Sequence, residues 1–168
     1  QVARQIIALD DDDLEFYLEE IKEYLLDSST DPFIKTMLLS KLHEAKIEEQ
    51  IRIRKFKMDI EIIPSQYPAV GDVNFSKNVR HRIVQKLEDD NPVLKDFAVT
   101  LCDRFFFHIY PLEKDFHGTE NWAEALIFVA KEYLGVGEDI HQEEESNLSQ
   151  EFVDAVNFIL YVEQYINL

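Results

Sequence analysis

Residues 91–130 read NPVLKDFAVTLCDRFFFHIYPLEKDFHGTENWAEALIFVA, and this stretch decides the fold class. Its first half repeats apolar residues every three or four positions, which is the period of a helix with a buried face. The members of this repeat are Val93, Leu94, Phe97, Ala98, Leu101, Cys102, Phe105 and Ile109. Because Pro111 cannot continue a helix, we expect a central buried helix that ends there. A second helix then follows Gly118, and its apolar face begins at Trp122.

Helical spacing also flanks this stretch on both sides. A capping residue followed by proline, the usual start of a helix, occurs at Asp31-Pro32 and again at Asn91-Pro92. Each pair precedes two apolar residues and a lysine, so a repeat-like bundle is one interpretation and a common helix start is the other. The expected helical regions are 10–50 as a first helical pair, 79–136 as central helices and 148–168 as a C-terminal helix.

One segment departs from the helical period. Residues 51–64 alternate isoleucine with charged residues, which is the two-residue period of a strand, and a turn near Lys55–Lys57 would make them a hairpin. We therefore expect a mainly α fold of about six helices in an α-helical bundle with one small β-hairpin. These elements are expected to form a single globular domain over residues 1–168. Because the chain begins with Gln1 rather than Met, we expect it to be a piece of a longer protein.

Composition and charge narrow the range of functions. With 46% hydrophobic residues and 4 Gly, the chain can form a core but lacks the turn residues of an all-β fold. Its formal net charge of −17 repels phosphate and anionic lipid, so we expect neither a nucleic-acid nor a membrane partner. The single cysteine, Cys102, excludes a disulfide framework within the chain, and we expect a cytoplasmic protein.

The charge is distributed unevenly along the chain. Residues 51–86 carry eight basic and three acidic residues, a net charge of +5. One interpretation is that neighbouring acidic residues compensate this charge; the other is that it forms a surface for an acidic protein partner. On the second interpretation, the partner-binding residues are Arg52, Arg54, Lys55, Lys57, Arg80 and Arg82. The edge of the hairpin would also accept a partner strand, or a second copy of the chain in a homodimer.

Motifs that carry chemistry are sparse. The sequence has no Gly-rich phosphate loop and no Gly-flanked serine nucleophile. His108, His117 and His141 with Glu143–Glu145 are the remaining metal candidates, but no metal-binding spacing such as HExxH or CxxC supports them. We therefore predict no catalytic residue, no metal site and no cofactor.

An aromatic pocket is the alternative to a non-catalytic role. His108, Tyr110, His117 and Trp122, together with Phe116, are close enough in sequence to line a small-molecule-binding or catalytic pocket. The other interpretation of the same aromatic residues is a filled core. The direction in which these groups point distinguishes the two.

The run FFFHIYP at Phe105–Pro111, followed by NWAEAL at Asn121–Leu126, resembles the C-terminal segment of an uncharacterised group of Firmicute tetratricopeptide-repeat proteins. The two proline-started helices and the alternating strand segment fit the same resemblance, which covers about residues 10–134. The resemblance implies that the repeats themselves precede Gln1. It also implies an adaptor or scaffold role rather than a reaction, so we expect a non-catalytic protein-interaction domain.

Overall fold

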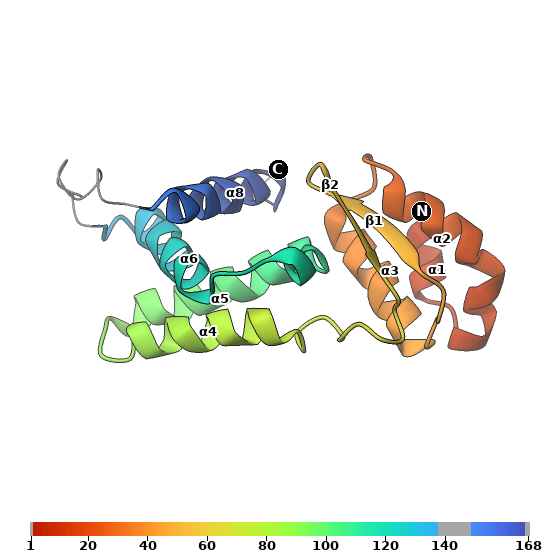
Figure 1. The fold of residues 1–168 in the computed structure, drawn as a ribbon, viewed down its shortest axis with the longest axis horizontal. Helices are drawn as coiled ribbons and strands as arrows, with labels where there is room; N and C mark the ends of the chain where they lie inside the picture. Colours follow the sequence, from red (N-terminus) through yellow and green to blue (C-terminus); the bar gives the residue numbers. More distant parts are fainter. Residues whose placement is uncertain (1, 138–148, 167–168) are drawn as a thin grey trace. The chain divides into compact units, whose positions relative to one another are not determined.

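The computed structural model describes residues 2–137 and 149–166, and its fold is mainly α with one small β-hairpin, as the sequence predicts (Figure 1). The contacts within the chain divide it into two compact units. Unit 1 comprises Gln1–Val73 and Phe107–Asp115, and unit 2 comprises Asn74–Phe106 and Phe116–Leu168. That residues 1–168 form a single domain stays a prediction.

Unit 1 combines helices with the hairpin. Its elements are α1 (Val2–Ile7), the 3₁₀ helix η1 (Asp11–Tyr17), α2 (Leu18–Leu26), α3 (Pro32–Glu44), β1 (Ile51–Lys55), β2 (Met58–Ile62) and the 3₁₀ helix η2 (Leu112–Asp115). Helix α1 packs against α3, and α2 packs against β1. The isoleucines of the hairpin, Ile51, Ile53, Ile60 and Ile62, are all buried. Burying this apolar face against helices gives stability to a hairpin that would be marginal alone.

The hairpin has the register that the alternating sequence predicts. β1 pairs antiparallel with β2, with Ile51 opposite Ile62 and Lys55 opposite Met58. The two residues between the strands, Phe56 and Lys57, have φ values of 50° and 65°. This left-handed conformation at both positions is the one that a two-residue type I′ turn requires. The turn therefore forms here without the usual Asn-Gly pair.

Unit 2 is helical throughout its described residues. Its elements are α4 (Asn74–Lys86), most of α5 (Pro92–Ile109), α6 (Thr119–Leu134) and α8 (Gln150–Ile166). Both α4 and α8 pack against α6 (Figure 1). Helix α4 begins at Asn74 rather than at residue 79, where the sequence predicted it. Phe75 lies four residues before Val79 and extends the same helix face, with its ring 6.1 Å from that of Phe106.

The helix ends follow local signals. Asp31 Oδ1 accepts a hydrogen bond from the Phe33 N–H at 2.8 Å before α3, and Asn91 Oδ1 accepts one from the Val93 N–H at 2.8 Å before α5. Helix α5 ends at Ile109, as its proline predicts. These caps satisfy backbone donors that the first turn of a helix leaves without partners.

No helix in the described part of the chain combines the length and the apolar character that crossing a membrane requires.

Candidate functional site

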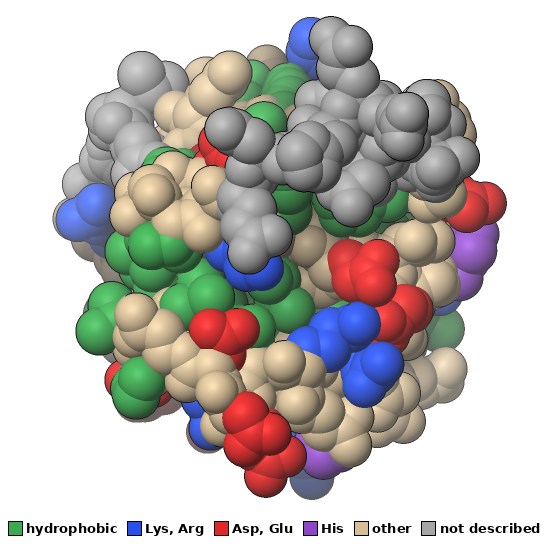
Figure 2. Space-filling view, turned by 90° about the vertical axis from the view of Figure 1, so that its left-hand side faces the viewer, with side chains coloured by type: hydrophobic (Ala, Val, Ile, Leu, Met, Phe, Trp, Pro, Cys, Tyr) green, Lys and Arg blue, Asp and Glu red, His purple; other side chains and the backbone are tan. Residues whose placement is uncertain are grey.

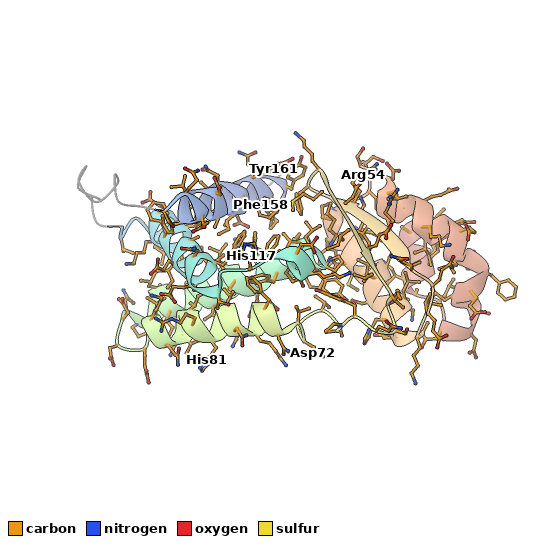
Figure 3. All side chains as sticks on the ribbon, viewed as in Figure 1. Arg54, Asp72, His81, His117, Phe158 and Tyr161 are labelled. Atoms are coloured by element: carbon orange, nitrogen blue, oxygen red, sulfur yellow. The ribbon has the colours of Figure 1, made fainter. Side chains whose placement is uncertain are left out.

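Two of the predicted partner-binding residues lie on the outer face of the hairpin. The side chains of Arg52 and Arg54 are 59% and 46% exposed, and Arg54 is labelled in Figure 3. Arg54 Nε lies 2.8 Å from Asp59 Oδ1, and Arg52 Nε lies 3.6 Å from Glu61 Oε1. Each acidic partner stands directly opposite its arginine on β2. The hydrogen bond from Arg54 lowers the pKa of Asp59, so this face carries paired charges rather than a purely basic patch.

The predicted residues on α4 are paired as well. Arg80 Nε lies 3.0 Å from Asp103 Oδ1, and Arg82 Nε lies 2.6 Å from Glu120 Oε2. Hydrogen bonds from Arg82 and then Lys86 lower the pKa of Glu120 from 4.5 to about 2. On the face that Figure 2 draws, Lys and Arg side chains lie beside Asp and Glu side chains. Acidic neighbours thus compensate much of the positive charge of residues 51–86.

A basic binding surface would require Lys55 to be exposed beside these arginines, but Lys55 is buried. It is 2% exposed, because strand alternation puts it on the buried face of β1 with Ile51 and Ile53. Its Nζ donates hydrogen bonds to Thr36 Oγ1 at 2.5 Å and to the His108 carbonyl at 2.9 Å. Lys57 is exposed and lies in the turn itself.

The end of α5 explains the position of Lys55. The last carbonyls of a helix lack N–H partners. Continuing the helix would pair the Phe107 carbonyl with the N–H of residue 111, but Pro111 has no N–H to donate. Thr36 Oγ1 donates to this Phe107 carbonyl at 2.7 Å, while Lys55 donates to the next carbonyl, that of His108. A cation also suits the negative end of the helix dipole. Thr36 and Lys55 therefore cap the C-terminus of α5.

A buried carboxyl group lies in the same unit. Glu113, in η2, is 2% exposed, and its Oε2 has no hydrogen-bond partner among the described residues. Burial raises the pKa of Glu113 from 4.5 to about 7, and its own backbone N–H and the charge of Lys55 oppose this rise. Burial also lowers the pKa of Lys55 well below 10.5, against the opposing charge of Glu113. Burial therefore disfavours the charged form of both residues, and their mutual attraction offsets this effect only in part.

Two tyrosines complete this group. The Tyr67 hydroxyl is buried and has no hydrogen-bond partner within the described ranges, and burial, followed by the charge of Glu113, raises its pKa. Tyr110 donates to the Pro68 carbonyl at 2.7 Å, and its ring centre lies 5.7 Å from that of Tyr67. We call the set of Thr36, Lys55, Tyr67, Tyr110 and Glu113 the buried polar cluster.

The sequence contained one overlooked signal for this cluster. Residues 51, 53 and 55 share one face of a strand, so the isoleucines at the first two positions place Lys55 inside. No comparable pattern surrounds Glu113, which lies in a short segment between two helices. Its short helix packs against β2, which lies far earlier in the chain.

The residues of the predicted aromatic pocket are divided between the two units. His108 and Tyr110 belong to unit 1, whereas His117 and Trp122 belong to unit 2. The Trp122 ring stacks on that of Phe116, with ring centres 4.7 Å apart. It also lies 5.7 Å from the ring of Phe105 and 6.2 Å from that of Phe158, which α8 contributes and Figure 3 labels. His117 is exposed. Within unit 2, Trp122 thus lies in a cluster of aromatic rings, in which Phe105 is buried and the other rings are partly exposed.

Among the surface hollows that described residues line, two lie elsewhere. One, of about 430 Å³, lies in unit 1, and its lining includes Arg4, Tyr24, Asp27 and Ile34. The other, of about 400 Å³, lies in unit 2 and is lined by residues including Lys86, Phe128, Lys131 and Phe152. None of the predicted pocket residues lines either hollow. The aromatic pocket thus stays a prediction.

Within residues 2–137 and 149–166, no group of three or more His, Cys, Asp or Glu side chains is arranged to hold a metal ion. Two parts of the sequence-based metal candidate, His141 and Glu143–Glu145, lie outside the described residues. Cys102 is 1% exposed, and burial raises the pKa of its thiol, which disfavours the reactive thiolate.

Comparison with known proteins identifies a similar protein but does not assign the chain to a family. The chain is 29% identical over 149 residues to the TPR repeat-containing protein YsoA of Bacillus subtilis (strain 168). This similarity covers 89% of the chain and 44% of that protein, so the chain spans less than half the length of this relative. No family model matches the chain, and no solved structure matches it. The similarity to YsoA confirms the resemblance to a Firmicute tetratricopeptide-repeat protein that the sequence predicted.

Proposed function

We propose that this chain is a non-catalytic protein-interaction domain, of the adaptor or scaffold kind, in a cytoplasmic bacterial protein. The observation that carries this proposal is the similarity, along 89% of the chain, to a protein named for its TPR repeats. Stacked helical repeats present extended surfaces that bind other proteins. We infer that a domain beside such repeats serves the same kind of task, by contacting the protein that the repeats bind or by recruiting a second one.

The outer face of the hairpin is the proposed binding surface. Its ion pairs, Arg52 with Glu61 and Arg54 with Asp59, are exposed, and exposed pairs are held weakly because water screens them. Carboxylates of an acidic partner segment can therefore replace the internal partners, and a guanidinium group binds a carboxylate through two parallel hydrogen bonds. Lys57 adds a cation at the turn, whereas Lys55 is buried and takes no part.

Side-chain docking suits this hairpin better than the addition of a partner strand. On β1, the Arg54 carbonyl accepts a hydrogen bond from Lys35 Nζ at 2.6 Å. On β2, the Glu61 carbonyl accepts one from Lys114 Nζ at 2.9 Å. Since a lysine already occupies one carbonyl group on each strand, each edge is a poorer template for pairing with a further strand.

Affinity capture from a bacterial cytoplasmic extract, at low and at moderate salt, tests both the function and the surface. The test variant combines Arg52→Glu with Arg54→Glu. The matched control exchanges one ion pair, as Arg54→Asp with Asp59→Arg, and so keeps the net charge. Arg80→Glu with Arg82→Glu tests the second set of predicted residues, on α4. Circular dichroism verifies that each variant keeps its helical content.

We expect the hairpin reversal to abolish capture and moderate salt to weaken it, because the contact is electrostatic. If the hairpin variant still captures the partner and the α4 variant does not, the binding surface lies on α4 rather than on the hairpin. Capture that survives both reversals would refute both basic surfaces while retaining the interaction function. Failure to capture any protein at either salt concentration would contradict the interaction function itself. Light scattering of the isolated chain distinguishes a second copy from a different partner.

A further inference from the structure

We propose that residues 107–115, which Lys55 and other side chains fasten to the rest of unit 1 by hydrogen bonds, form a proton-linked clasp that loosens when the buried side chain of Glu113 ionises.

Hydrogen bonds between side chains and carbonyl groups fasten this segment to the rest of unit 1. They are Thr36 Oγ1 to the Phe107 carbonyl at 2.7 Å, Lys55 Nζ to the His108 carbonyl at 2.9 Å, Tyr110 Oη to the Pro68 carbonyl at 2.7 Å, and Lys114 Nζ to the Glu61 carbonyl at 2.9 Å. Phe107 also packs its ring 5.2 Å from that of Phe33. Glu113 lies inside this fastened segment, so its charge state acts on the whole segment.

Glu113 is buried with its own backbone N–H as a donor, which is fewer donors than an ionised carboxylate requires. Its Oε2 accepts no hydrogen bond from the described residues, and the nearby ammonium group of Lys55 directs its hydrogen bonds to Thr36 and His108 instead. Transferring an ionised carboxylate from water into such a site is costly, whereas its protonated form is tolerated. The same burial raises its pKa to about 7.

Other charged and titratable groups near the clasp do not remove this cost. Tyr67 and Tyr110 present neutral hydroxyls, and burial raises the pKa of both phenols further. Asp115 acts on Tyr67 with a charge of the same sign as that of Glu113. Lys35 and Asp31 act on Lys55 with opposite signs. Lys114, on the same short helix, is exposed and is hydrogen bonded to the Glu61 carbonyl.

The sign of the pH dependence follows from linkage. Because the pKa of Glu113 is about 7 when folded and 4.5 ordinarily, the closed segment binds the proton more tightly than the open one. Its stabilising contribution is therefore complete below pH 4.5 and is lost as the pH rises through 7. Lys55 acts with the opposite sign: its lowered pKa gives a contribution that is present above pH 10.5 and is lost as the pH falls. Near neutral pH, ionised Glu113 makes the segment easier to open than at pH 5.

Hydrogen exchange of residues 107–115 in the intact chain, measured by mass spectrometry from pH 5 to pH 8, tests the clasp. After correction for the chemical exchange rate, we expect the opening constant to rise on the order of 50- to 100-fold over this range. Glu113→Gln should flatten the profile, because the side chain no longer ionises. The matched control Asp115→Asn changes an exposed carboxylate of the same short helix and should keep the rise.

A flat profile in the unaltered chain would overturn the proposal, as would a rise that Glu113→Gln leaves unchanged. If Glu113→Gln does not fold, the carboxyl carbon of Glu113 can be titrated by NMR in the unaltered chain. A midpoint near 7 supports the clasp, and a midpoint near 4.5 refutes it.

Discussion

Among the described residues, unit 1 and unit 2 each bury one carboxylate, and the two carboxylates differ in the donors that surround them. Glu113 in unit 1 and Glu163 in unit 2 are both 2% exposed. Glu163 Oε1 accepts hydrogen bonds from Arg104 at 2.5 Å and from the Tyr133 hydroxyl at 3.1 Å, whereas its Oε2, like that of Glu113, has no partner among the described residues. The carboxyl group of Glu113 accepts a hydrogen bond from its own backbone N–H. The nearby Lys55 donates its hydrogen bonds to the neutral oxygens of Thr36 and His108 instead. The depth of burial is therefore equal, and the supply of donors is not.

This difference shows which property decides the behaviour of a buried acid. A carboxylate with a guanidinium donor within hydrogen-bond distance can remain ionised inside a protein, although the pair adds little net stability. A carboxylate without such a donor shifts its pKa upward instead. Unit 2 contains an ion pair between Arg104 of α5 and Glu163 of α8, whereas in unit 1 burial raises the pKa of Glu113 to about 7.

The largest expected effect comes from breaking the ion pair of unit 2. Arg104→Met leaves Glu163 buried without its cation, and the free energy of unfolding should fall by about 3–5 kcal/mol. Urea unfolding at pH 7 measures this loss. The double variant Arg104→Met with Glu163→Leu should recover most of it, since replacing both members of such a pair by apolar residues leaves no buried charge without a partner. A loss below about 1 kcal/mol for Arg104→Met would show that Glu163 does not depend on the guanidinium.

An intermediate effect is expected from removing Thr36, a hydrogen-bond partner of the buried Lys55 in unit 1. Thr36→Val keeps the shape of the side chain but removes the donor to the Phe107 carbonyl and the acceptor for Lys55, at a cost of about 1–3 kcal/mol in unfolding free energy. The same substitution at Thr100, an exposed residue of α5, is the matched control and should change stability by less than about 0.5 kcal/mol. Equal losses at the two positions would contradict the capping role of Thr36.

The smallest effect is expected for an exposed ion pair. Arg80→Met makes the same change as Arg104→Met, but Arg80 and Asp103 have side chains that are 50% and 55% exposed. The loss in unfolding free energy should be at most about 1 kcal/mol, because water solvates the remaining charge. If Arg80→Met cost as much as Arg104→Met, burial of the acidic partner would not be what distinguishes the two pairs.

Most of the secondary structure could be predicted from local patterns. The caps at Asp31 and Asn91, the proline after α5 and the alternation along the hairpin all act over a few residues, and the structure confirms each. The start of α4 was predicted too late because Phe75 lies within what resembled a loop. A single aromatic residue next to Ser and Asn gives too little periodicity to reveal the first turn of a helix.

The sequence by itself determined that the chain is mainly α with one hairpin, because periodicity, capping and turn formation depend on neighbours along the chain. Only the tertiary structure decided which charges are buried and which donors they meet. Lys55 donates a hydrogen bond to the His108 carbonyl, 53 residues away in the chain, and Arg104 donates one to Glu163, 59 residues away. The cost of burying a charge is set by these distant atoms, so a net charge or a run of basic residues could not reveal it.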